Sequence, residues 1–251
     1  MIKYFRKIRQ NLIMENKSGK YIKYAIGEIV LVVIGILIAL SINNWNEKRI
    51  EQQTLTNYYE RMLGELESSR NNLSDFKEEI NNLVDDNRKT LEILNNNNRD
   101  SIQVLKTTLG ALGTSWTNNF NFPLVKEFIN EGYLAKVKNV KIKDGLQAFS
   151  IQLTHFNNLD NAIHDQYTYT IEPFINKNLN YSEIALDGYK RDLVSGGPKT
   201  NIDNLFNNLE AWNVISLKLE LLISQNYRLT AFEAMIERLT NSLKAELENS
   251  I

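Results

Sequence analysis

The sequence predicts an all-α protein in which a single N-terminal transmembrane helix is followed by an extracytoplasmic antiparallel bundle of long, coiled-coil-like helices. Three observations predict this fold. Residues 29–42 form an uncharged apolar run, apolar residues recur with helical spacing in three later segments, and no segment alternates like a strand. We therefore divide the chain into a basic tail (1–23), a membrane helix (24–45) and the bundle (46–251).

The tail is predicted to be a short basic amphipathic helix lying on the inner leaflet of the membrane. Apolar residues recur at steps of three or four, mostly with basic and polar residues between them, at Ile2, Phe5, Ile8, Leu12 and Ile13. A disordered basic tail is the alternative. A turn at Asn16, Ser18 and Gly19 is expected to lead into the span.

Residues 24–45 have the length of a membrane span. As a helix they would cover roughly 33 Å, close to the hydrocarbon thickness of a bilayer. Tyr24 and Trp45 place aromatic rings at the two ends, where interfacial anchors are expected. Glu28 is the only ionisable residue of the segment. It lies about one turn from Tyr24, which favours a side chain reaching the cytoplasmic interface over a functional intramembrane carboxylate.

The distribution of charge sets the orientation of this span. Seven Lys and Arg residues but only one acid, Glu15, precede it, and a short positive flank stays in the cytoplasm. The N-terminus is therefore predicted to be cytoplasmic and the C-terminal domain periplasmic, on an inner membrane. The remainder of the chain is mildly acidic, which argues against a nucleic-acid partner. The lipid bilayer is the expected partner of the tail and span.

A cleaved signal peptide is the alternative interpretation of the N-terminal segment. Ala39 and Ser41 are small residues that flank a possible cleavage point after Ser41. A retained span is favoured because the basic region is unusually long, Glu28 interrupts the start of the apolar run, and Trp45 suits an anchored helix. The chain has no cysteine, which excludes a lipoprotein anchor and disulfides.

The span also carries a possible helix contact. Gly35 and Ala39 are four residues apart and share one face, a spacing that lets two membrane helices approach closely. We therefore predict a weak homodimer, with an ordinary apolar helix as the alternative.

The N-terminal blocks resemble a known family. The run KYIKYAIGEIVLVVIGILIAL at 20–40, NNWNE at 43–47 and MIKYFRKIRQ at 1–10 are similar to the opening of an uncharacterised family of small, N-terminally membrane-anchored proteins of Gram-negative bacteria of the Bacteroidota type, a domain of unknown function. A weaker match runs from Phe122 to Leu134, where Asn130 and Glu131 depart from the expected small residues. The resemblance implies an inner-membrane protein of unknown activity and supplies no catalytic residue.

The first long helix beyond the span is predicted to reach about Leu94. Its apolar seam keeps a 3.5-residue period for more than four heptads. Ser69 and Asn87 lie on this seam, which favours a bundle with polar layers over a two-stranded coil. The full seam is Leu55, Tyr59, Met62, Leu66, Ser69, Leu73, Phe76, Ile80, Leu83 and Asn87.

Short elements are predicted next. A loop at 95–100 precedes a helix at 101–112, and 113–121 is irregular. Pro123 suits the first turn of a short helix that Gly132 closes in the left-handed conformation.

The second long helix is predicted to begin at Asn139 or Lys141 and to reach about Leu179. Pro173 should bend or break it. Its buried side is formed by Ile142, Leu146, Phe149, Leu153, Phe156, Leu159 and Ile163.

The last long helix is predicted to follow a loop at 180–199, in which Gly196, Gly197 and Pro198 form a turn. Thr200 and Asp203 resemble a capping box that starts the helix. Its apolar stripe is Leu205, Leu209, Trp212, Ile215, Leu219, Leu222, Leu229, Phe232, Ile236, Leu239, Leu243 and Leu247.

The sequence predicts no catalytic, cofactor-binding or metal-binding residue, and so no enzyme. His155 and His164 are nine residues apart, which places them on different helix faces. The best candidate for a partner surface is an aromatic patch, with ordinary capping of the core as the alternative. The patch consists of Trp116, Phe120, Phe122, Tyr167 and Tyr169.

Two classes of function remain. The first is a membrane-anchored helical scaffold or interaction module for an unknown protein partner. The second is a ligand-sensing bundle, which would have to signal through a partner because only about two dozen residues lie inside the cell. A hydrolase with an unrecognised site is disfavoured.

Overall fold

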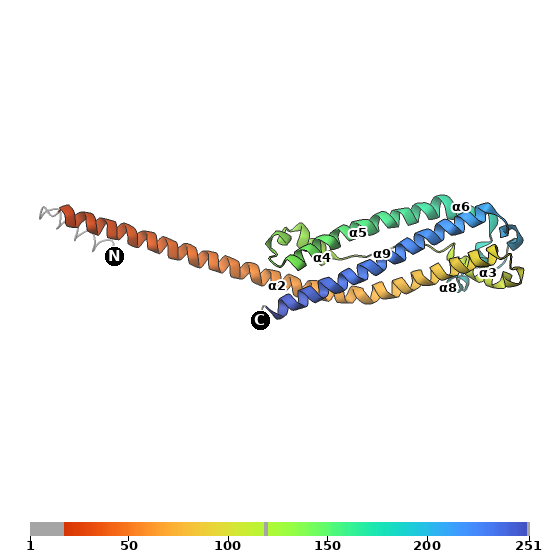
Figure 1. The fold of residues 1–251 in the computed structure, drawn as a ribbon, viewed down its shortest axis with the longest axis horizontal. Helices are drawn as coiled ribbons and strands as arrows, with labels where there is room; N and C mark the ends of the chain where they lie inside the picture. Colours follow the sequence, from red (N-terminus) through yellow and green to blue (C-terminus); the bar gives the residue numbers. More distant parts are fainter. Residues whose placement is uncertain (1–17, 118–119, 250–251) are drawn as a thin grey trace. The chain divides into compact units, whose positions relative to one another are not determined.

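The computed structural model describes residues 18–117 and 120–249, and every regular element in them is helical (Figure 1). The predicted all-α class is confirmed for these residues. The chain forms two compact units, unit 1 (Met1–Asn57) and unit 2 (Tyr58–Ile251). The predicted tail helix lies outside the described residues. The predicted turn at Ser18 and Gly19 is wrong, since both belong to a helix.

The helix α2 (Ser18–Asn95) begins in unit 1 and carries the apolar run. Within it, an 18-residue window reaches a mean hydropathy of 2.8, and none of that window is buried. It is the one helix among the described residues that is long and apolar enough to cross a membrane. The predicted apolar N-terminal helix is therefore confirmed as an element. Just beyond the run, Arg49 lies over the ring of Trp45, 5.9 Å from its centroid.

In unit 2, α2 continues to Asn95 and buries the predicted seam. Most seam residues are buried, among them Met62, Leu66, Ile80 and the polar Asn87. Asn87 satisfies its amide by donating to the carbonyl of Leu83, 2.8 Å away. The 3.5-residue period thus identified the buried face of this helix correctly.

Two more long helices complete unit 2 (Figure 1): α5 (Val140–Gln166) and α9 (Leu209–Glu248). Asn139 Nδ2 donates to Glu246 Oε2 over 2.8 Å at one end of this pair. Gln166 Nε2 donates to Leu217 O over 2.9 Å at the other. The two helices therefore run antiparallel. All seven residues predicted for the buried side of α5 are buried.

Ion pairs set the direction of α2 against α9. Lys77 Nζ lies 2.8 Å from Glu233 Oε2, and Glu67 Oε1 lies 2.7 Å from Lys244 Nζ. Since the partner number falls as the α2 number rises, α9 runs antiparallel to this part of α2 as well. These pairs are partly exposed and contribute little stability, but they show the register of the two helices.

Short helices connect the long ones. The first group lies between α2 and α5, and the 101–112 helix predicted there is divided into an α-helix flanked by two 3₁₀ turns. These elements are η1 (Arg99–Ser101), α3 (Ile102–Thr108), η2 (Leu109–Ala111), α4 (Pro123–Asn130) and η3 (Tyr133–Lys136). Gly132 ends the α4 region with a φ of 78°, as predicted. Glu65 of α2 adds a contact that the sequence did not predict, because its two carboxylate oxygens accept from Leu124 N and Val125 N at the start of α4.

The proline prediction for the second long helix is confirmed. After α5, residues Tyr167–Ile171 form a π-helical segment, η4, which leads into α6 (Glu172–Asn178). Pro173 cannot donate a backbone hydrogen bond to the preceding turn, so a local break there is expected. The same proline stands at the first turn of α6, a position where the missing donor does no harm.

The predicted loop at 180–199 contains two short helices, α7 (Tyr181–Ile184) and α8 (Asp187–Lys190). Gly196 and Gly197 have φ values of 124° and 83°, which confirms the predicted turn. Asn180 Nδ2 stabilises this turn by donating a hydrogen bond to Gly196 O, 2.8 Å away.

The predicted start of the last helix is wrong. Thr200 does not cap a helix, because its hydroxyl accepts from Asn180 N at 2.7 Å. Asp203 lies in the short η5 (Ile202–Leu205) and pairs with Arg99. The helix α9 begins at Leu209, where Asn208 caps it.

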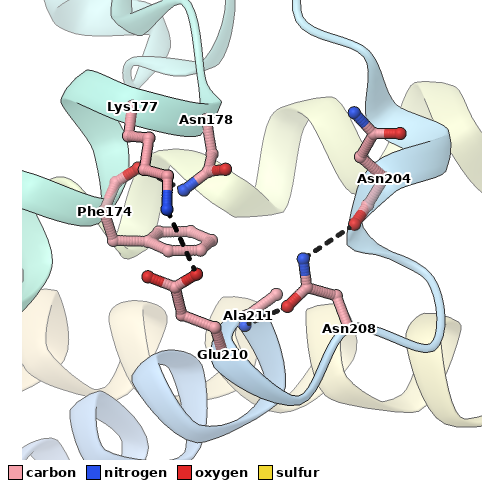
Figure 2. A network of polar contacts seen from close by, with 7 residues as sticks. All are labelled: Phe174, Lys177, Asn178, Asn204, Asn208, Glu210 and Ala211. Carbon is pink, nitrogen blue, oxygen red and sulfur yellow. Dashed lines mark hydrogen bonds and ion pairs between the residues drawn. The ribbon is translucent and has the colours of Figure 1, made fainter.

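Figure 2 shows the start of α9. Asn208 Oδ1 accepts from Ala211 N at 3.1 Å, and Asn208 Nδ2 donates to Asn204 O at 3.0 Å. Leu209, predicted to be buried, is instead 73% exposed. The buried face at this end of α9 begins at Ala211.

Candidate functional site

The predicted aromatic patch is divided between different places in unit 2. Phe122 is buried, its ring centroid 4.8 Å from that of Phe149 and 5.8 Å from that of Phe232. The Phe120 ring lies 5.5 Å from that of Phe156 and also contacts Phe232. These two patch residues therefore belong to an aromatic core between α5 and α9.

The other three patch residues do not share one surface either. The Trp116 ring lies 6.5 Å from that of Tyr189. Tyr167 is partly buried and packs against the core, whereas Tyr169 is 77% exposed. Of these three, Trp116 belongs to the loop 113–117, and Tyr167 lines a pocket together with residues of that loop.

Close packing against α7 holds the loop 113–117 in place. A side chain at Gly110 would meet the backbone, since its Cβ would lie 2.7 Å from Ile184 O. A Cβ at Gly113 would lie 2.7 Å from the Tyr181 ring. Glycine is required at Gly110 because the backbone of a second segment lies against it, whereas a side chain at Gly113 would displace the ring of Tyr181.

Hydrogen bonds fix the same loop from the other side. Thr114 Oγ1 donates to Gly110 O at 2.9 Å. Gln225 of α9, which is buried, donates through Nε2 to Trp116 O at 3.0 Å. The loop therefore has a defined path between α7 and α9, and its side chains are positioned by both.

A buried lysine lies behind this loop. Lys218 of α9 is 2% exposed, and its Nζ donates to Ser115 Oγ at 3.0 Å. No carboxylate in residues 18–117 and 120–249 forms an ion pair with this ammonium group. Burial lowers the pKa of Lys218 from 10.5 to about 8. Because a buried charge normally needs a partner of opposite sign, the position is costly and is a candidate for function.

The protonation state decides what the pair of Lys218 and Ser115 can do. Burial leaves the pKa of Lys218 at about 8, above neutral pH, so the protonated form predominates at pH 7. It therefore acts mainly as a donor, and the hydroxyl of Ser115 remains able to donate its own proton. This favours the binding of an anion over the activation of Ser115 as a nucleophile, which would need a neutral lysine.

A pocket of about 300 Å³ opens beside Ser115. One wall is the loop 113–117, and another is the end of α5 with Ile163 and His164. The rings of Tyr167, Tyr181 and Tyr189 form the rest of the lining, which contains no carboxylate. The pocket thus combines aromatic surface with hydroxyl groups and has the buried lysine behind one wall.

The phenol groups of Tyr167 and Tyr181 in the pocket stay protonated. Burial raises the pKa of Tyr181, and the nearby Tyr167 and Tyr189 raise it further. Burial, followed by the charge of Glu172, raises the pKa of Tyr167. These phenols are therefore hydrogen-bond donors throughout the physiological pH range.

The histidines and the span residues do not contribute to one site. His155 is exposed on α5, and His164, also exposed, reaches the pocket wall alone. Among the described residues, no group of three His, Cys, Asp or Glu side chains is placed to hold a metal ion.

In unit 1, Trp45, Gly35 and Ala39 are exposed and Glu28 is partly exposed. A Cβ at Gly35 would meet nothing within 4 Å, so this face is open to a neighbouring helix. The side chain of Tyr24 lies outside the described part of the chain.

Neither Lys218 nor Ser115 was predicted from the sequence. A signal for Lys218 was present, because the buried positions Ile215, Lys218 and Leu222 follow helical steps of three and four. A charged residue on such a stripe marks a buried charge. No sequence signal placed Ser115 opposite it, since the two residues are 103 positions apart.

The chain matches no family model, no curated protein and no solved structure. The resemblance of its opening to a family of membrane-anchored proteins stays a prediction, and function is argued from the fold and the pocket.

Proposed function

We propose that this chain is a single-span inner-membrane protein whose N-terminus is cytoplasmic and whose helical bundle stands in the periplasm as a scaffold or interaction module. The proposal includes membership of the uncharacterised membrane-anchored family that the opening resembles. The bundle would hold a protein partner close to the membrane.

The observation that carries this proposal is the exposed apolar part of α2. An 18-residue window of this helix has a mean hydropathy of 2.8, and none of its residues is buried. Helices of soluble proteins bury such a surface, and a bilayer is the environment that accepts it. The basic flank before residue 24 supports the proposed orientation.

A second candidate function is ligand sensing by the periplasmic unit. The pocket beside Ser115 and the buried Lys218 favour it, since an interaction module alone does not explain a buried lysine that has no ion-pair partner among the described residues. Such a sensor would signal through a partner in the membrane.

Site-specific photo-crosslinking in intact cells tests the interaction module. A photoreactive phenylalanine analogue replaces Tyr169 or Tyr227, each 77% exposed, so that either change is mild. At one or both sites we expect a discrete adduct with a different protein. The analogue at the buried Tyr59 is the matched control and should give no such adduct.

Two results would count against the module. One is the absence of any discrete adduct at both exposed sites. The other is an adduct formed only with a second copy of the chain, which would replace the proposed partner by self-association.

A further inference from the structure

We propose that the pocket beside Ser115 binds a small organic carboxylate, with Ser115 and the tyrosine hydroxyls donating to its oxygens and Lys218 supplying positive charge from behind Ser115. The inference rests on the ligand-sensing candidate and gives its ligand a chemical class.

The size of the pocket limits the ligand. A volume of about 300 Å³ is at the lower end of the usual range for ligand pockets. The ligand is therefore comparable to an amino acid or a small aromatic acid. The aromatic rings of Tyr167, Tyr181 and Tyr189 suit a flat or apolar body.

The side chains that line the pocket favour an anionic ligand. The lining contains hydroxyl donors and no carboxylate, so a cation would find no counter-charge there. Lys218 has no ion-pair partner among the described residues, and its ammonium group donates to Ser115 Oγ in the pocket wall. A carboxylate at Ser115 would offset the cost of burying this ammonium group.

A neutral ligand would account for fewer features of the pocket. The hydroxyl groups could bind a neutral ligand equally well. A neutral ligand would, however, leave the burial of the Lys218 ammonium group unexplained. The carboxylate accounts for both the donors and the lysine.

Calorimetric titration of the full-length protein in detergent with benzoate and benzamide tests this inference. The two probes have nearly the same shape and differ in charge. We expect benzoate to bind about tenfold more tightly or better, as charge-assisted hydrogen bonds predict. Lys218→Met should remove this preference, and Ser115→Ala should weaken benzoate binding. Lys177→Met, which removes an exposed lysine, should change neither.

Equal affinity for the two probes, no binding of benzoate, or an unchanged preference in Lys218→Met would overturn the inference. Circular dichroism of each variant confirms that it is folded. Should Lys218→Met fail to fold, Ser115→Ala decides the question, because this position is in a loop. The titration needs neither a membrane nor a partner, so its outcome is independent of the crosslinking result.

Discussion

At the scale of single residues, Lys218 is the position where stability and function are in conflict. Its neighbours on the buried face of α9 are apolar, and its ammonium group has a serine hydroxyl in place of a carboxylate. A methionine has a similar length and would pack in the same space without the cost of burying a charge. The lysine is therefore expected to destabilise the fold.

We predict that Lys218→Met raises the free energy of unfolding by on the order of 1–3 kcal/mol at pH 7. Burial lowers the pKa of Lys218 from 10.5 to about 8. The unfolded chain therefore binds more protons between these values, and the stability of the unmodified protein rises with pH across this window. The advantage of methionine should be complete below pH 8 and small by pH 10.5.

Chemical denaturation at pH 7 and pH 10 measures this difference, with Lys177→Met as the control for the loss of an exposed charge. An advantage that is equal at both pH values would show that Lys218 is not the titrating group.

At the scale of helices, the sequence predicted buried faces better than helix starts. The seam of α2 and the buried side of α5 follow from apolar spacing alone, because most residues of each face are buried. The predicted start of α9 was wrong. Thr200 and Asp203 are residue types that cap helices, and they have the correct spacing, but their side chains contact Asn180 and Arg99 instead. Residue spacing does not reveal which polar side chains form tertiary contacts and are therefore unable to cap a helix.

Asn208 is the residue that replaces the predicted cap, and its truncation tests the corrected start of α9. Asn208→Ala removes the acceptor for Ala211 N (Figure 2) and should lower the free energy of unfolding by about 1 kcal/mol. Asn208→Asp keeps an acceptor and should retain most of the stability. Thermal unfolding of both variants measures the loss, and a neutral Asn208→Ala would refute the role of this cap.

The apolar helix of unit 1 provides a second prediction at this scale. Gly35 is open to contact on its face, which suits close approach of a second copy. We expect a weak dimer of the full-length protein in detergent that Gly35→Leu dissociates. Light scattering at increasing concentration measures the mass. A monomer at every concentration, unaffected by Gly35→Leu, would remove the proposed dimer.

At the scale of the whole molecule, the sequence predicted a helical protein with one apolar helix, and the structure has both. The pocket was not predictable, because it joins the loop 113–117 to residues of four later elements that are distant in the chain. Only folding brings Ser115 to Lys218 and to the three tyrosines. Fold class thus follows from local periodicity, whereas the candidate site depends on tertiary contacts.

Retention of the N-terminal segment distinguishes an anchored protein from a secreted one. The long basic flank, Glu28 and Trp45 favour an uncleaved span. Mass spectrometry of protein purified from membranes should therefore recover peptides from residues 1–42. An N-terminus at Ile42 would show cleavage and make the rest of the chain a soluble exported domain.

The most direct test of the central claim is the compartment of the C-terminus. A phosphatase reporter that is active only outside the cytoplasm is fused after Ile251, and a reporter that is active only in the cytoplasm is fused at the same point in a matched strain. The basic flank and the uncharged span predict activity of the phosphatase alone. Activity of the cytoplasmic reporter alone would contradict the proposed orientation and with it the periplasmic role.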